Sequence, residues 1–104
     1  MAGGIPERPA RAETVRRGIR AVLERGPATA RTLSREVGIS ERDVAGHLEH
    51  LRRTLRREGR RLEVEPASCL RCGFRFEKRA RITRPGRCPR CGGERISLPV
   101  FHIP

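Results

Sequence analysis

Residues 69–73 read CLRCG and residues 88–92 read CPRCG, so two Cys-x2-Cys pairs are separated by fifteen residues. This is the ligand spacing of a zinc ribbon. Zn²⁺ prefers four ligands in a tetrahedron with Zn–S distances near about 2.3 Å, and a two-residue spacer lets one tight turn aim two sulfurs at one point. The sequence therefore predicts one structural Zn²⁺, held by Cys69, Cys72, Cys88 and Cys91.

The residues around the cysteines fit this interpretation. Gly73 and Gly92 follow the two pairs and can adopt a positive φ, which turns backbone amides toward the thiolates. Pro89 stiffens the second turn. Apolar and charged residues alternate over 74–76 and 78–83, which predicts two short strands. A segment this short has too little apolar surface to fold by burial, so the metal must supply its folding energy.

Other uses of four cysteines are possible in principle. Two disulfides are disfavoured in a reducing cytoplasm, and a thioredoxin-type pair needs only one Cys-x2-Cys in a βαβ setting. Iron is the main alternative, because both pairs resemble the knuckles of rubredoxins, which hold one iron for electron transfer. Rubredoxins look acidic and rich in aromatic residues, whereas this chain is neither. Four thiolates also leave no open ligand position, so hydrolytic metal chemistry is not expected.

Composition narrows the remaining function classes. The chain has 104 residues, 24 Lys+Arg against 12 Asp+Glu, a net charge of +12 and three aromatic residues. So small a core cannot build the deep apolar pocket of a large enzyme, and we expect no catalytic site. No apolar stretch is long enough for a membrane span, and no secretory leader is evident, so we expect a cytoplasmic protein. The positive charge attracts polyanions.

The first sixty residues predict an arm and three helices. Residues 1–11 hold glycines and prolines with little apolar content, which indicates a disordered arm. Val15, Ile19, Val22 and Leu23 then recur on one helical face, and Gly26-Pro27 ends that helix. Thr29 is the expected N-cap of a second helix, which buries Leu33 and Val37.

The third helix follows after a short glycine turn. Gly38 suits a left-handed conformation, Ile39 points into the core and Ser40 caps the next helix. The apolar positions of this helix are Val44, Leu48, Leu51 and Leu55, and Arg56, Arg57 and Gly59 mark its end. Two helices joined in this way behind a supporting helix predict a helix-turn-helix. A generic three-helix bundle without a nucleic-acid role is the alternative.

The stretch LSREVGISERDVAGHLEHL at residues 33–51 resembles helix 2, the turn and helix 3 of the ArsR-type winged-helix repressors. In that family the third helix enters the major groove of DNA. The resemblance implies DNA contacts by Ser40, Arg42, Asp43, Gly46 and His47. His47 and His50 are expected to be ordinary exposed residues of this helix.

Arginines are dense after the third helix. We place a phosphate-binding stripe at Arg52, Arg53, Arg56, Arg57, Arg60 and Arg61. Leu62 and Val64 alternate with charged residues and predict a strand. Winged helices have a hairpin, the wing, after helix 3. Either the wing here is minimal, or this strand pairs with ribbon residues such as those in 97–103.

The whole chain resembles predicted prokaryotic transcriptional regulators that fuse an N-terminal winged helix-turn-helix to a C-terminal zinc ribbon. The junction EPASCLRCGF at 65–74, the knuckle RCPRC at 87–91 and the closing ISLPVF at 96–101 carry this resemblance. The expected fold is α+β, with a three-helix winged helix-turn-helix over 12–66 and a four-cysteine ribbon over 67–104.

Three functions follow from these expectations. The first is a transcriptional regulator that binds double-stranded DNA, with a homodimer expected if it acts as winged helices usually do. The second is a protein-interaction module of the transcription apparatus, because the domain order resembles the α subunit of transcription factor E, which contacts RNA polymerase. Phe74, Phe76 and Phe101 are either contact residues of such a module or ribbon core. The third is a rubredoxin-like iron electron carrier.

Overall fold

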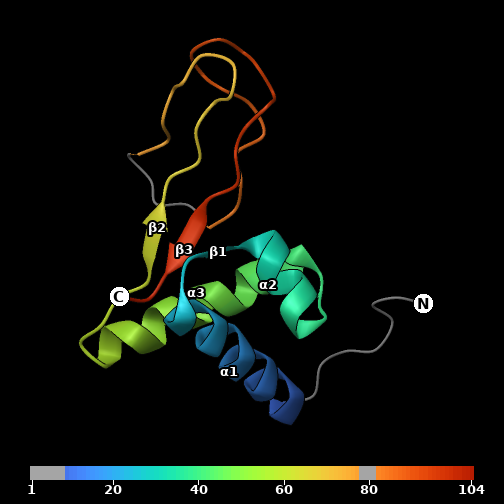
Figure 1. Cartoon of the computed structure of the whole chain (residues 1–104), viewed down its shortest axis with the longest axis vertical. Coiled ribbons are helices and arrows are strands. Elements are labelled where there is room, and N and C mark those ends of the chain that lie inside the picture. The colour runs from blue at the N-terminus through green and yellow to red at the C-terminus, as the bar shows by residue number, and fades with distance from the viewer. Residues whose placement is uncertain (1–8, 78–81) are drawn as a thin grey trace.

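In a computed structural model, which describes residues 9–77 and 82–104, three helices pack beneath a small sheet from which the cysteine-bearing segment projects (Figure 1). The helices are α1 (Pro9–Arg25), α2 (Ala30–Val37) and α3 (Glu41–Arg57). The strands are β1 (Ala28–Thr29), β2 (Glu63–Glu65) and β3 (Val100–His102). The expectation of three helices with a small amount of sheet and a four-cysteine ribbon is confirmed.

Local sequence sets the helix boundaries. Thr29 Oγ1 accepts a hydrogen bond from Thr32 N at 3.2 Å, and Ser40 Oγ accepts one from Asp43 N at 3.0 Å. Both residues therefore act as the expected N-caps. Gly38 has φ 73° and lets its amide reach Ser34 O at 2.9 Å, which ends α2. Ser34 Oγ donates to the Ile39 carbonyl across the same turn.

The start of α1 differs from the sequence prediction. The helix begins at Pro9, so residues 9–11 are helical rather than part of an arm. Proline suits the first turn of a helix, because its φ is already helical and it gives up an amide that has no partner there. The rest of the predicted arm, residues 1–8, lies outside the described residues.

The sheet joins segments that are distant in the sequence. Its order is β1-β3-β2, with β3 antiparallel to both neighbours. Phe101 lies opposite Ala28 in β1 and opposite Val64 in β2. Of the two possibilities for the strand after α3, pairing with residues in 97–103 is therefore confirmed. The cysteine-bearing segment, residues 66–99, thus lies between two paired strands, and the end of the ribbon returns to the sheet.

The core follows this topology. Leucine, valine and isoleucine side chains of α1, α2 and α3 pack with Leu62 of the segment before β2 and with Ile82, Phe101 and Ile103 from the chain beyond the first cysteine pair. Phe101 is completely buried there. The prediction of Phe101 as either a contact residue or ribbon core is therefore wrong, because β3 carries it into the helical core.

The ribbon has a second, smaller core. Ala67, Cys69, Cys88 and Ile96 are buried, with Phe74 and Phe76 packed against them. The two rings meet edge to face, with centroids 5.1 Å apart. Only an isolated bridge, Ser68 to Arg75, occurs where residues 74–76 were expected to form a strand. The second expected strand falls largely on residues 78–81, outside the described part of the chain.

Candidate metal centre and helix face

The four cysteines meet at the end of the ribbon. Their sulfur atoms all lie within 4.8 Å of one another, with Cys69–Cys91 and Cys72–Cys88 separations of 3.6 Å. A tetrahedron with Zn–S near about 2.3 Å has sulfur–sulfur edges of about 3.8 Å. The cysteines are free thiols, and 3.6 Å far exceeds the length of a disulfide. The sulfurs are therefore positioned to bind one metal ion.

The two cysteine turns have the same construction. The amide of the fifth residue of each turn donates to the carbonyl of the first cysteine, Gly73 N to Cys69 O and Gly92 N to Cys88 O, both at 2.9 Å. Both glycines have positive φ, 83° and 75°. This backbone conformation favours glycine, because an L side chain would be strained in it. The prediction that these glycines shape the knuckles is thus confirmed.

Backbone amides also point at the sulfurs. Arg71 N lies 3.4 Å from Cys69 Sγ, Arg90 N lies 3.3 Å from Cys88 Sγ, and Gly93 N lies 3.4 Å from Cys91 Sγ. Amide dipoles aimed at a thiolate stabilise its negative charge, so they favour the deprotonated ligands that a metal requires. The hydrogen bonds that orient the sulfurs therefore come from the knuckle backbones themselves.

Two thiols of the cluster have pKa values shifted in opposite directions. A hydrogen bond from the backbone of Cys72 and a second from Arg71 lower the pKa of Cys69 to about 6, against the effect of burial. For Cys72 the backbone of Phe74 acts to lower the pKa, but burial and the neighbouring thiols outweigh it and raise the pKa to about 11. Four thiols this close cannot all ionise easily without a cation. The donor set thus fits a divalent metal, with four soft thiolates of the kind that suit zinc.

The residues predicted to contact DNA lie along α3 and just beyond it. The turns of the helix place Arg42, Gly46, Arg53, Arg56 and Arg57 on its exposed side, opposite the buried stripe. Nothing lies within 4 Å of a Cβ built on Gly46, so this side is open to approach. Ser40 and Asp43 are exposed at the helix start.

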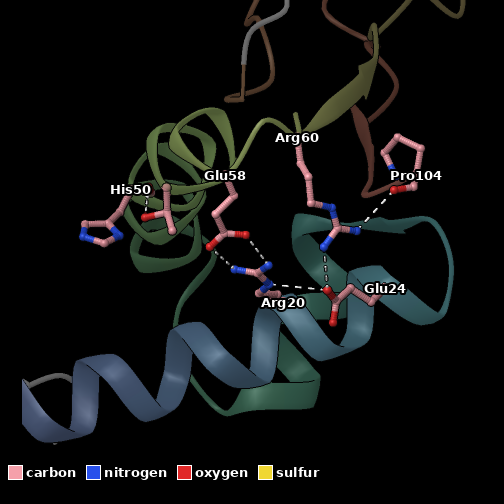
Figure 2. Close-up of polar contacts among 7 residues, drawn as sticks. Arg20, Glu24, His50, Glu58, Arg60 and Pro104 are labelled. Atoms are coloured by element: carbon pink, nitrogen blue, oxygen red, sulfur yellow. Dashed lines mark hydrogen bonds and ion pairs between the residues drawn. The ribbon is translucent and has the colours of Figure 1, made fainter.

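His47 is placed differently from the expectation of an exposed residue. Its side chain is only 7% exposed, and its Nδ1 lies 3.4 Å from Arg16 Nη1 of α1. Helical geometry explains the difference, because position 47 falls one turn after the buried Val44 and beside the buried Leu48. His50, by contrast, is exposed, and its ring points away from the neighbouring ion pairs (Figure 2).

The predicted arginine stripe divides into two groups. Arg60 bonds Glu24 Oε2 and the Pro104 carbonyl, both at 3.2 Å, so it ties α1 to the end of the chain (Figure 2). Arg61 pairs with Glu63 at 3.2 Å, and Arg52 lies 4.0 Å from Glu49. Within the part of the chain that the structure describes, Arg53, Arg56 and Arg57 have no carboxylate partner.

Sequence reasoning missed the ion pairs beneath α3. Arg20 Nη2 lies 2.6 Å from Glu58 Oε1 and its Nη1 lies 3.1 Å from Glu58 Oε2, while Glu24 is 3.4 Å from Arg20 Nε (Figure 2). The hydrogen bond from Arg20 holds the pKa of Glu58 below its usual value. Glu58 follows α3 directly, so this bidentate pair fastens the end of α3 to α1. No local spacing in the sequence signals a pair 38 residues apart.

Comparison with known proteins places both halves of the chain in related families. Residues 14–63 match the family described as PF0610-like, N-terminal, and residues 66–104 match the PF0610 rubredoxin-like zinc beta-ribbon domain. The solution NMR structure of protein PF0610 from Pyrococcus furiosus is similar over 100% of this chain and 98% of that chain, at 30% identity and a TM-score of 0.77. No curated protein matches the chain. Within the described residues, no helix combines the length and apolar character needed to cross a bilayer.

Proposed function

Since this chain belongs to the PF0610-like family, in which a helical N-terminal domain is joined to a rubredoxin-like zinc ribbon, we propose that it is a DNA-binding transcriptional regulator without catalytic activity. The proposal treats α2 and α3 as a helix-turn-helix and the β2–β3 hairpin as its wing. The order of elements supports this, because β2 follows α3 and pairs antiparallel with β3. The similarity to PF0610 supports the fold and does not supply the function.

One observation carries the proposal: the exposed side of α3 holds four arginines. Arg42, Arg53, Arg56 and Arg57 are all exposed on this helix, and Glu49 is the acidic residue among them. The pKa of His50 responds to the positive charge of these arginines. Burial lowers the pKa of His50, and the positive charges of Arg16, Arg53 and Arg57 lower it further. A helix face with this potential attracts the phosphates of duplex DNA.

Roles within the proposed interface differ by position. Arg42 and the open backbone at Gly46 lie in the first half of α3, which a helix-turn-helix presents to the base edges. Arg53, Arg56 and Arg57 lie toward its end and suit the phosphate backbone. Arg52 of α3 and Arg61, which follows the helix, keep a phosphate-binding role in the proposal although each lies near a carboxylate. His47 and Arg60 do not contact DNA in this proposal, because each is held by a residue of α1.

Salt dependence tests this proposal without knowledge of the target sequence. Four arginines that each neutralise one phosphate give log K a slope against log salt of about −3.6 from α3 alone. R53Q/R57Q should make the slope shallower by about 1.8, because two of these contacts are lost. The matched control is R11Q/R17Q, which removes two exposed charges from α1. Absence of salt-dependent duplex binding by the unaltered protein would refute the proposal.

A role as a protein-interaction module of the transcription apparatus is the second candidate, and the start of α3 favours it. Glu41 and Asp43 are exposed in the first turn, and Glu41 lies 3.7 Å from Arg31 of α2. These carboxylates reduce the positive potential where a base-reading helix would enter the groove. Retention of purified RNA polymerase on the immobilised chain, together with weak binding of naked DNA, would favour this function.

The metal and the oligomeric state complete the proposal. We propose that the resident ion is a single structural Zn²⁺, which would cross-link the two knuckles and would leave no open ligand position. Elemental analysis and colour distinguish zinc from the iron of a rubredoxin-like electron carrier, because iron–thiolate sites are coloured and redox-active. A homodimer on a palindromic site stays a prediction. Light scattering with and without duplex DNA measures it.

A further inference from the structure

We propose that the metal-binding end of the ribbon is a second contact site for duplex DNA, where arginines of the two knuckles bind backbone phosphates beside the segment held by α3. This inference rests on the proposed function and extends it to a surface of the ribbon that has no role in the proposed helix-turn-helix contacts. The site consists of Leu70, Arg71, Arg90 and Arg95, and is called the knuckle patch below. All four residues are exposed.

The knuckle backbones hold two of these arginines in matching positions. Arg71 and Arg90 are each the third residue of a cysteine turn, and each amide donates to the sulfur two residues earlier. Metal binding therefore fixes the backbone from which each guanidinium extends. An arginine on a fixed backbone loses less conformational freedom when it binds a phosphate than one on a mobile loop.

The two knuckles bring their arginines to the same end of the ribbon. A Cβ built on Gly93, in the second knuckle, would lie 3.4 Å from Arg71 Cδ and 3.2 Å from Cys91 Sγ. The side chain of Arg71 thus extends from the first knuckle over the second, the one that carries Arg90. Leu70 N donates to the Arg95 carbonyl at 2.8 Å, which brings Arg95 beside the first knuckle as well.

The arginines of the knuckle patch differ from Arg75 and Arg87 of the same ribbon in having no carboxylate partner among the described residues. The two carboxylates of the ribbon are already paired, Glu77 with Arg75 at 3.7 Å and Glu94 with Arg87 at 3.4 Å. Among the described residues, the guanidinium groups of the patch have no carboxylate within salt-bridge distance. Three exposed arginines without a carboxylate partner, on backbone segments that meet at the knuckles, are complementary to a row of phosphates.

The position of the ribbon suits a second contact with the same duplex. The ribbon is inserted between β2 and β3 and extends away from the helices (Figure 1). In the proposed function the β2–β3 hairpin is the wing, and residues 66–99 enlarge it, so these residues would reach DNA outside the groove that α3 occupies. Leu70, which stands between Cys69 and Arg71 in the sequence and is 62% exposed, offers an apolar surface for the sugar carbons. The ligand class is therefore the sugar–phosphate backbone of duplex DNA.

The test compares two double variants of the full, zinc-loaded chain. R71Q/R90Q removes the two knuckle arginines, and R75Q/R87Q removes the same charge from the same ribbon at positions paired with carboxylates. Binding of a labelled mixed-sequence duplex is titrated by anisotropy from about 50 to about 200 mM salt. Zinc content is measured by native mass spectrometry for each variant.

We expect R71Q/R90Q to make the slope of log K against log salt shallower by about 1.8. R75Q/R87Q should keep the slope of the unaltered protein, and both variants should keep their zinc. Equal losses in both variants would overturn the proposal, because a diffuse field would then explain them. An unchanged slope in R71Q/R90Q would also overturn it. If that variant loses zinc, the arginines serve the thiolate cluster, and this outcome would overturn the proposal as well.

Failure of the underlying function has a different signature. If α3 does not bind DNA, the unaltered protein shows no salt-dependent binding, or R53Q/R57Q leaves the slope unchanged. If only the knuckle proposal fails, the unaltered protein binds and R53Q/R57Q weakens it, while R71Q/R90Q does not. The four proteins measured on one duplex therefore separate the two outcomes.

Discussion

Val64 lies opposite Phe101 in the antiparallel pair of β2 and β3. The cysteine-bearing segment, residues 66–99, connects these two strands. Phe101 also lies opposite Ala28 in β1 and has no exposed surface. A single side chain from the end of the sequence therefore completes both the sheet and the helical core. The helices all precede the knuckles in the chain, and β3 returns to the helical core only after them.

Phe101→Ala should destabilise the helical core rather than the ribbon. The substitution leaves a cavity between the sheet and the helices, and such a change in a fully buried phenylalanine costs about 3–5 kcal/mol. We expect the urea midpoint of the far-UV circular dichroism signal to fall accordingly. Zinc content under native conditions should be unchanged.

Phe76→Ala is the matched control, because Phe76 is a partly buried phenylalanine that packs against the ribbon core. It should leave the helical transition within about 1 kcal/mol of the unaltered protein. Equal losses from the two substitutions would show that the helices and the ribbon form one cooperative unit.

Cys88→Ser should release the metal and unfold the ribbon while the helices of residues 12–57 remain. We expect the metal to supply the folding energy of the ribbon, and Cys88 is one of the two buried cysteines of the site. The topology adds a cost to the helical core. Residues 66–99 become a loose connection between β2 and β3, and closing it costs about 2 kcal/mol more than closing a four-residue hairpin.

Circular dichroism and zinc analysis check this prediction together. The helix signal at low temperature should persist, with a lower unfolding temperature, and the amide of Phe101 should exchange faster with solvent. Arg87→Gln, next to Cys88 and exposed, serves as the control and should retain zinc. Complete loss of helix signal in Cys88→Ser would mean that β3 cannot be held without the metal.

The sequence was most informative where one residue type has one physical role. The cysteine spacing predicted the metal site, and Thr29, Gly38 and Ser40 predicted the helix boundaries that the structure confirms. These are local signals, because a cap or a knuckle involves residues only a few positions apart. The pairing of β2 with β3 was expected only as one of two possibilities, since nothing in either strand specifies a partner across the ribbon.

The electrostatic part of the candidate site was harder to predict. Arg60 looked like a phosphate ligand from its place in a row of arginines, but it bonds Glu24 and Pro104. His47 looked exposed, but α1 covers it. Both differences come from tertiary contacts between distant residues. A run of charges in the sequence specifies net charge and leaves open which members find carboxylate partners.

Glu58→Gln should lower stability at neutral pH and leave it unaffected in acid. The pKa of Glu58 is below its usual value of 4.5 in the folded protein, chiefly because Arg20 donates hydrogen bonds to it. A depressed carboxyl pKa contributes stability above the unfolded pKa, and this contribution is lost as the pH falls through the folded pKa. The difference in unfolding temperature between the two proteins should therefore shrink as the pH falls below 4.5.

Comparing the two proteins at each pH removes the effect of zinc release, which acid causes equally in both. Glu13→Gln, in an exposed i,i+4 pair with Arg17, is the control and should show little difference at any pH. Added salt should reduce the gap between Glu58→Gln and the unaltered protein at pH 7, because 42% of the Glu58 side chain is exposed. A gap that persists unchanged to low pH would point to lost packing instead of lost charge.

Ser40→Ala and Ser40→Asp separate two roles of one residue at the start of α3. Ser40 Oγ accepts from Asp43 N, so alanine should cost about 1 kcal/mol of folding stability, whereas aspartate retains the cap. If Ser40 also lies beside a DNA phosphate, the added charge of aspartate should weaken duplex binding although the protein stays stable. Urea unfolding and anisotropy on the same samples measure both effects. Duplex binding by Ser40→Asp equal to that of the unaltered protein would remove Ser40 from the interface, and equal destabilisation by both substitutions would contradict its role as a cap.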